Sequence, residues 1–407
     1  MQFPQLVRIA TASLLIIATA ASIVAAQQPP PAEGTEADLI AVLQSADAPL
    51  FDKAKACQQL AVIGTKECVP ALAGLLGDEK LSHYARYGLE PLPDPAVDEA
   101  LRSALGDLDG GLLVGVINTI GMRQDEEAVD TLKQLMDDSD AQVAGAAAGS
   151  LGQIHTPAAI AALKAALDGA EPLRTAAGDA SLTAVDMLID EGNGTEAAAI
   201  CDDLRKADVA DHIHIAALQG AIRALGDDGL PRLAECLQSD NRDVFRVGLG
   251  MANEIGGPEA ASLLSDALEL PSDGDSHPRA ALLIYALGDL GERTALPIVL
   301  KAAENAAPDV RQAAIRTIGL LGDASAVEVL LAAAVDDEAL SSAARESLAD
   351  LEGEEVDAAI TKAFDTAEGN QRLVLIGLIG DCGIAAAVPA LKQAVDDEDL
   401  EVATAAI

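Results

Sequence analysis

Few side chains in this sequence are suited to chemistry, and its five histidines are the first to consider. His212 and His214 are the only two that lie close together in the chain. Residues two apart on a helix point about 200° away from each other, so this pair cannot bind one metal ion there. We therefore expect one solvated and one half-buried histidine, and no metal site.

The cysteines also number five, and they form no C-x-x-C motif. An odd count without such a motif predicts neither a disulfide framework nor a haem attachment site. Each falls at an apolar position, where a free cysteine behaves as a small hydrophobic residue. Cys201 and Cys236 follow two helix ends by a similar number of residues, so a disulfide between them stays open as an alternative. The others are Cys57, Cys68 and Cys382.

Runs of acidic residues are the third candidate feature. None has the ligand spacing, central glycine and distal glutamate of a calcium-binding EF-hand loop. Each run precedes a predicted helix, where aspartate caps the helix and complements its dipole, although a cation site is the alternative. If the turns align, they form an acidic ridge that attracts basic partners. The runs are Asp137–Asp140, Asp273–Asp275, Asp336–Glu338 and Asp396–Asp399.

The composition limits how these residues can be positioned. The chain has 407 residues and is 50% hydrophobic, yet only 2% of it is aromatic and it has no Trp. Alanine and aliphatic residues must fill the interior, which suits thin layers of closely packed helices better than one large core. The formal net charge of −40 repels phosphates and anionic lipid heads, so we expect no nucleic-acid partner.

A repeated sequence pattern predicts these closely packed helices. An alanine-rich amphipathic helix ends in an apolar residue and a glycine, four variable residues follow, and a second helix begins. Glycine can end a helix in the left-handed conformation, and proline in the next first turn loses no hydrogen bond. The glycines are Gly64, Gly226, Gly256, Gly291, Gly322 and Gly383; the prolines are Pro70, Pro231, Pro297 and Pro389.

We call the residue that ends each first helix a stop. The spacing of the stops along the chain predicts the number of helical hairpins. Equivalent positions without the glycine lie near Pro93, Gln124, His155, Asp190 and Leu351. About eleven helical hairpins result, and a single hairpin cannot bury its apolar face alone. The prediction is an all-α fold: a right-handed α-solenoid, an ARM/HEAT-like superhelix of stacked hairpins.

Three segments resemble a known repeat. The residues from Val310 to Leu331 and from Pro278 to Val299 look like the HEAT-like repeat named after phycobilisome lyase subunits. The segment from Cys57 to Leu101, with "LSHYARYGLEPLPDPAVDEAL", is similar to the opening units of exported bacterial HEAT-repeat proteins. The resemblance implies the solenoid fold and is shared by scaffolds, lyases and hydroxylases.

The resemblance therefore leaves more than one function open. Deoxyhypusine hydroxylases hold a di-iron centre through His-Glu pairs, and no histidine here precedes a glutamate. Bilin lyases have no comparably sharp motif. We expect a scaffold without a catalytic, metal or cofactor site. It binds a protein partner through a groove of second helices or through the acidic edge, which favours a basic partner. A lyase- or hydroxylase-type enzyme, or a spacer attached to a further domain, is the alternative.

The pattern of the first 26 residues predicts an export signal. Arg8 precedes an uncharged run, and Val24 and Ala26 fit the small-residue positions of a cleavage site. An uncleaved anchor is the alternative reading. We assign 1–26 to a signal peptide, 27–35 to a Pro-rich linker and 36–407 to the solenoid, with the protein periplasmic or extracellular and not inserted in the membrane once the signal is removed.

The last residues predict an incomplete unit. The acidic run at Asp396 parallels the one at Asp336, but the sequence ends within the helix that follows, without a glycine stop. Terminal units of a solenoid need a polar outer face. The expectation is that the native product continues beyond Ile407.

The signal assignment gives a first prediction. Cleavage after Ala26 leaves a mature protein that begins at Gln27 and is found outside the cytoplasm. Intact-mass measurement and N-terminal sequencing of the native protein check this. A cytoplasmic protein that retains Met1 would contradict it.

Overall fold

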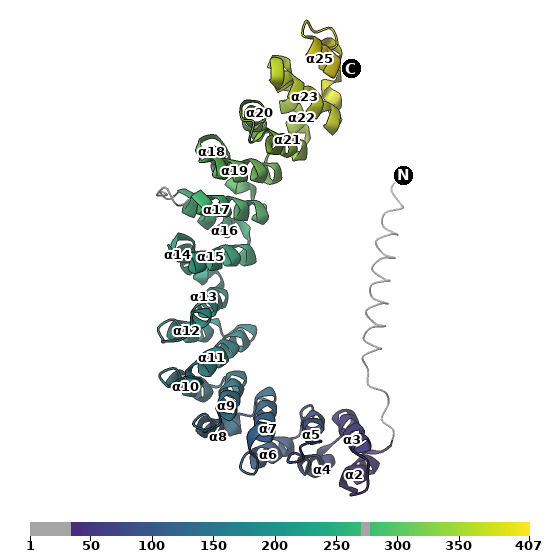
Figure 1. Ribbon diagram of the computed structural model, residues 1–407, viewed down its shortest axis with the longest axis vertical. Coiled ribbons are helices and arrows are strands. Elements are labelled where there is room, and N and C mark those ends of the chain that lie inside the picture. The colour runs from purple at the N-terminus through teal and green to yellow at the C-terminus, as the bar shows by residue number, and fades with distance from the viewer. Residues whose placement is uncertain (1–33, 270–276) are drawn as a thin grey trace. The chain divides into compact units, whose positions relative to one another are not determined.

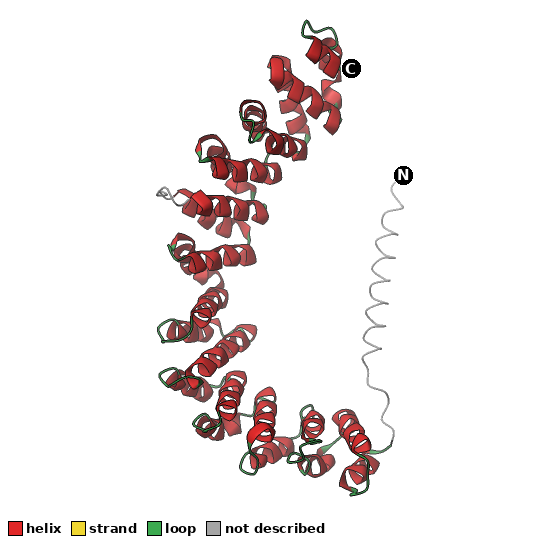
Figure 2. Cartoon of the chain, in the orientation of Figure 1, coloured by secondary structure: helices red, strands yellow, loops and turns green. Residues whose placement is uncertain are grey.

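A computed structural model describes residues 34–269 and 277–407, in which loops and turns join helices and no strand occurs (Figure 2). The all-α prediction is therefore confirmed. The chain divides into two compact units, of which the first ends at Ala184 and the second begins at Val185. The assigned signal peptide, 1–26, and most of the linker lie outside the described residues. Thr35 caps the first described helix, and Asp38 completes the capping box.

The first unit holds α2 and four complete hairpins. Each hairpin pairs a first helix with a second helix, and α11 (Leu173–Asp190) runs across the boundary at Ala184. The elements are α2 (Glu36–Gln44), α3 (Leu50–Ile63) with α4 (Val69–Ala73), α5 (Ser82–Leu89) with α6 (Pro95–Ala104), α7 (Gly110–Met122) with α8 (Val129–Leu135), and α9 (Ala141–Ile154) with α10 (Pro157–Ala166).

The second unit continues the same alternation. Counted with α11, the described residues form the eleven hairpins that the sequence predicts, and α25 follows them. The elements are α12 (Gly194–Leu204), α13 (Asp211–Leu225) with α14 (Leu230–Gln238), α15 (Arg242–Ile255) with α16 (Gly257–Glu269), α17 (His277–Leu290) with α18 (Leu296–Asn305), α19 (Pro308–Leu321) with α20 (Val327–Asp336), α21 (Ser341–Asp350) with α22 (Glu354–Thr366), α23 (Gly369–Cys382) with α24 (Val388–Ala394), and α25 (Leu400–Ala405).

Within the second unit the helices form two layers (Figure 1). Consecutive first helices pack on one another from α13 to α23, and consecutive second helices from α18 to α24 do the same. Each hairpin thus touches mainly its own two neighbours, which is the arrangement that defines an α-solenoid.

The hairpin turns follow the predicted pattern with one correction. Pro70, Pro231, Pro297 and Pro389 all lie in the first turn of a second helix, as expected. Four of the six stop glycines have positive φ, from +54° at Gly226 to +70° at Gly291. Gly64 and Gly322 do not: both are extended, with φ of −66°. A Cβ on Gly322 would lie 2.6 Å from Leu351 Cδ2, so glycine is needed there for space.

The variable residues after the stops are also more regular than the sequence suggests. In six hairpins they form a 3-10 turn that leads directly into the second helix. Thr65, Asp125 and Asp323 cap three of these turns through their side chains. His155 stands at a stop in the left-handed conformation, with φ of 38°, where a glycine would be unstrained.

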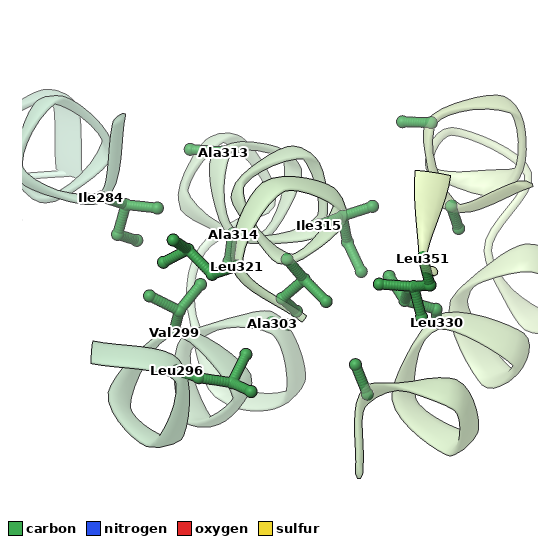
Figure 3. Packing of buried hydrophobic residues seen from close by; sticks show 14 of the residues in the cluster. Ile284, Leu296, Val299, Ala303, Ala313, Ala314, Ile315, Leu321, Leu330 and Leu351 are labelled. Carbon is green, nitrogen blue, oxygen red and sulfur yellow. The ribbon is translucent and has the colours of Figure 1, made fainter. Parts of the chain in front are cut away.

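The core lies between the two layers of each unit. In Figure 3, Val299 of α18 and Leu321 of α19 point into the space between the layers, together with Ile284 of α17. Ala313 and Ala314 fill the narrow positions of α19 and are fully buried. Small and aliphatic residues build most of this core, as the composition predicts, and Phe245 and Phe364 are the buried aromatic residues among them.

Three pairs of consecutive first helices, α7 with α9, α17 with α19 and α19 with α21, approach one another closely through the same two kinds of residue. A buried serine or threonine donates a hydrogen bond to a backbone carbonyl of the preceding first helix. The bonds are Ser150 Oγ to Ile117 O at 2.8 Å, Thr317 Oγ1 to Ile284 O at 3.3 Å and Ser347 Oγ to Ile315 O at 2.9 Å. Four residues after each of these carbonyls a glycine faces the hydroxyl residue; they are Gly121, Gly288 and Gly319.

Gly319 tests this packing. A Cβ at Gly319 would lie 2.9 Å from Ser347 Oγ and 3.1 Å from Ser347 Cα, so Gly319→Ala must separate α19 from α21. We expect a loss of about 1–3 kcal/mol of unfolding free energy, the usual effect of overpacking. Denaturant unfolding followed by circular dichroism measures it.

Gly250 is the matched control, because it is an exposed glycine inside α15 whose added Cβ would meet no atom within 4 Å. Gly250→Ala should stabilise the protein by about 0.5–1 kcal/mol through helix propensity. Equal effects of the two substitutions would contradict the close-packing interpretation.

Candidate functional site

The histidines are dispersed in the structure as the sequence predicts. His212 is exposed, and His214 is half-buried with Nε2 3.0 Å from Ala207 O. Because a carbonyl only accepts, His214 Nε2 must carry the proton of this bond. In residues 34–269 and 277–407 no three His, Cys, Asp or Glu side chains form a group suited to a metal ion.

The cysteines are all free thiols, so the disulfide considered between Cys201 and Cys236 does not form. Both of these thiols are buried instead, each within its own hairpin core. Burial raises the pKa of Cys57 and Cys201 to about 12, and that of Cys68 and Cys236 to about 11. Cys382 differs from the apolar environment expected for it, since it is exposed at the end of α23.

Two of the three acidic turns in the described residues cap the following helix, as expected, while α21 begins after Leu340 without a side-chain cap. Asp140 accepts a hydrogen bond from Gln142 N at the start of α9, and Asp399 accepts one from Glu401 N at the start of α25. Asp337 accepts from Ala339 N at 3.0 Å and also from the Arg311 guanidinium at 2.9 Å. The run 273–275 lies outside the described residues.

Arginines connect the acidic side chains of one hairpin to the next. In α14, Arg232 makes two hydrogen bonds to Asp202, of 2.6 and 2.9 Å, and these lower the pKa of the Asp202 carboxyl. Such part-exposed pairs are worth only about 0–1 kcal/mol each, so their main effect is to fix how neighbouring hairpins are aligned. The other pairs are Arg102–Asp125, Arg123–Asp98, Arg279–Asp240, Arg311–Asp337 and Arg372–Asp397.

Exposed apolar side chains mark a different surface from the one expected. The sequence led us to expect a groove of second helices, yet the large exposed apolar residues lie mostly on first helices. In the first unit they are Leu50, Phe51, Val62, Tyr87 and Met122; in the second they are Ile255, Leu282, Tyr285 and Leu320. On second helices of the described residues, only Val388 belongs to this class.

Three of these residues form a continuous apolar strip in the second unit, which we call the first-helix stripe: Leu282, Tyr285 and Leu320. Leu282 and Tyr285 are one turn apart on α17, and both are exposed, by 46% and 41%. Gly288 lies one turn beyond Tyr285 on α17. Leu320 of α19 is 67% exposed and packs over this glycine: Leu320 Cδ1 would lie 3.4 Å from a Cβ added to Gly288. The absence of a side chain at Gly288 lets α19 extend the strip.

Acidic residues flank the first-helix stripe. Glu254, Asp289, Asp350 and Asp381 are exposed in the last turns of α15, α17, α21 and α23. Leu320 lies in the last turn of α19. Arg316 lies one turn before Leu320 and is also exposed. The end of the layer near the stops is therefore apolar at its centre and negatively charged on both sides.

A small notch opens on the same layer. It has a volume of about 110 Å³ and lies between α21 and α23, beside Gly377, whose added Cβ would meet no atom within 4 Å. Leu373 and Leu378 form its apolar wall, and Arg345 and Asp381 stand at its edge. Its size suits one side chain of a partner.

Sequence reasoning missed the first-helix stripe because its residues share the helical spacing of the buried ones. Leu320 and Leu321 are adjacent and identical, but the first is exposed and the second is fully buried. One signal was present: Tyr285 is one of three tyrosines in an aromatic-poor chain, and tyrosine is enriched at interfaces.

Among residues 34–269 and 277–407, no helix combines the length and the apolar composition that a membrane crossing requires.

Comparison with known proteins agrees with the helical-hairpin fold. The sequence profile of HEAT repeats matches residues 97–181 and 275–349. No curated protein matches the chain significantly.

Three solved structures are similar to parts of the chain at low identity. Human deoxyhypusine hydroxylase in complex with glycerol is 20% identical, with a TM-score of 0.28 over 70% of this chain and 96% of that one. A complex of Kap95p with RanGDP is 11% identical, with a TM-score of 0.42 over 92% and 66%. A Kap121p mutant is 12% identical, with a TM-score of 0.46 over 91% of this chain and 48% of Kap121p, so the chain spans about half of that protein.

The environment of the thiols gives a prediction. Cys382 should react with an aromatic disulfide reagent within minutes, whereas the other four cysteines, which are buried, should react only after denaturation. Counting the released thiolate before and after addition of guanidinium measures both groups. The Cys382→Ser variant should lose the fast phase alone; a second fast thiol in that variant would show that a hairpin core is open.

Proposed function

We propose that this protein is an exported, non-catalytic scaffold whose first-helix stripe binds a protein segment that carries both basic and apolar residues. The observation that carries the proposal is the exposed strip of Leu282, Tyr285 and Leu320 between exposed carboxylates. Large apolar side chains exposed in a continuous strip and rimmed by charge are typical of protein-binding surfaces.

The fold supports binding over an extended length. Stacked hairpins present equivalent positions at regular intervals along one layer, so a partner can be contacted at several successive helices. Tyr285 offers a rigid aromatic anchor, and the notch beside Gly377 offers a recess for one further side chain.

The negative charge of the protein indicates which kind of partner segment the layer of first helices can bind. Asp289 lies one turn beyond Tyr285 on α17, Asp350 and Asp381 are exposed at the ends of later first helices, and the whole chain has a formal charge of −40. A partner with lysine or arginine next to apolar residues gains from both features, and its association is faster at low ionic strength. Nucleic acid and anionic membranes are repelled by the same charge.

A peptide-display experiment tests the proposal. Random twelve-residue peptides selected on the full chain should become enriched in sequences with basic and apolar residues. For an enriched peptide, Tyr285→Ala combined with Leu320→Ser should raise the Kd by about tenfold or more, equivalent to about 1.4 kcal/mol, because the apolar strip is removed. Fluorescence anisotropy measures the Kd.

Val395→Ser is the matched control, because Val395 is an exposed apolar residue outside the first helices. It should leave the Kd within twofold of the wild-type value. An equal rise of the Kd in Val395→Ser, or enrichment of acidic peptides in the selection, would contradict the proposal.

A further inference from the structure

A second concave surface lies away from the first-helix stripe, on the edge of the second unit where second helices turn into first helices. The pocket has a volume of about 430 Å³, within the range of sites that hold small ligands. It is enclosed by residues of α13, α14 and α15, with Arg205 from the residues after α12 (these helices are labelled in Figure 1).

Part of the pocket lining is apolar. Leu218 and Cys236 line it and are only 8% and 2% exposed, so they belong to the core of the hairpin. Ile215 and Val244, both half-buried, are also part of the lining. An aliphatic chain of a few carbons gains from burial against these four side chains.

The polar lining is mainly negative. Asp211 of α13, Glu235 of α14 and Asp243 of α15 contribute three carboxylates, against the single guanidinium of Arg205. Arg205 already lies 3.7 Å from Asp202, outside the pocket. Within the described residues, no ion pair involves Asp211, Glu235 or Asp243, whereas nearby Asp202, Asp240 and Glu254 each pair with an arginine.

The wall that carries these groups is held in place. His214 is tied by Nε2 to Ala207 O at 3.0 Å. Asn241 accepts hydrogen bonds from Asp243 N and Val244 N, which fixes the start of α15. A pocket whose walls are ordered by such bonds loses little conformational entropy on binding.

We propose that this pocket binds an ammonium or guanidinium group on an aliphatic stem, supplied by a lysine or arginine side chain of the polypeptide partner. The stem packs on Leu218 and Val244, and the cationic head is placed among Asp211, Glu235 and Asp243. The inference rests on the proposed function, since it adds a specific basic anchor to a partner already expected to be basic.

Peptide probes test the assignment on the full chain. One probe has a single lysine between two leucines, with both ends blocked; the second replaces the lysine by norleucine, which keeps the stem and removes the charge. The third probe is free n-butylammonium. Carbon–proton correlation spectra of the histidine rings report binding, with the His214 signal assigned by its loss in His214→Gln.

The lysine peptide should shift the His214 ring signals and leave those of His83, which lies in the other unit, unchanged. In the Glu235→Gln/Asp243→Asn variant the Kd should rise at least tenfold, while Glu259→Gln/Asp266→Asn, with the same change of charge on exposed residues of α16, should leave it within twofold.

Equal binding of the norleucine peptide, or an unchanged Kd in the pocket variant, would overturn the proposal. Binding of butylammonium without binding of the lysine peptide would overturn the assignment to a polypeptide side chain. None of these probes depends on Tyr285 or Leu320, so a failure here leaves the display result for the first-helix stripe standing, and the reverse also holds.

Discussion

The close approach of consecutive first helices is the constraint on which the rest of this structure depends. A hairpin of two helices cannot bury its apolar face alone, and at three junctions neighbouring first helices approach so closely that Gly121, Gly288 and Gly319 have room for little more than a hydrogen atom. The hydroxyls of Ser150, Thr317 and Ser347 are compatible with that distance because each reaches a backbone carbonyl of the preceding helix. Alanine-rich cores and the scarcity of aromatic residues follow from the same spacing.

Much of this architecture could be predicted from the sequence, because glycine and proline act locally. The stops gave the number of hairpins, and the prolines gave the start of the second helices. The backbone φ angle of each stop glycine could not be predicted as reliably as the positions of the helix ends. Gly226 and Gly291 have positive φ, but Gly322 is extended, since the demand there comes from Leu351, a residue of the next hairpin. The local sequence pattern identifies the residue at which a helix ends. The backbone conformation of that residue depends on contacts with residues distant in the sequence.

The surface was less predictable than the fold. Acidic turns stand out in the sequence, and the structure uses Asp140 and Asp399 to cap helices, whereas Asp337 pairs with Arg311. The stripe at Leu282, Tyr285 and Leu320 has no such signature, because exposure is decided by where the adjacent helices stand. The pocket beside His214 needed four segments to be brought together, from Arg205 to Val244, and no spacing rule connects them.

The hydroxyl-to-carbonyl bond between first helices has a consequence for how such a chain changes over generations. A helix carbonyl has two lone pairs, and the bond within its own helix uses one, so the bond from Ser347 to Ile315 O takes nothing from α19. The bonds from Ser150 and Thr317 are of the same kind. Loss of the hairpin of α19 and α20, which lies between two such junctions, would therefore leave α17 and α21 with faces of the same kind to pack together.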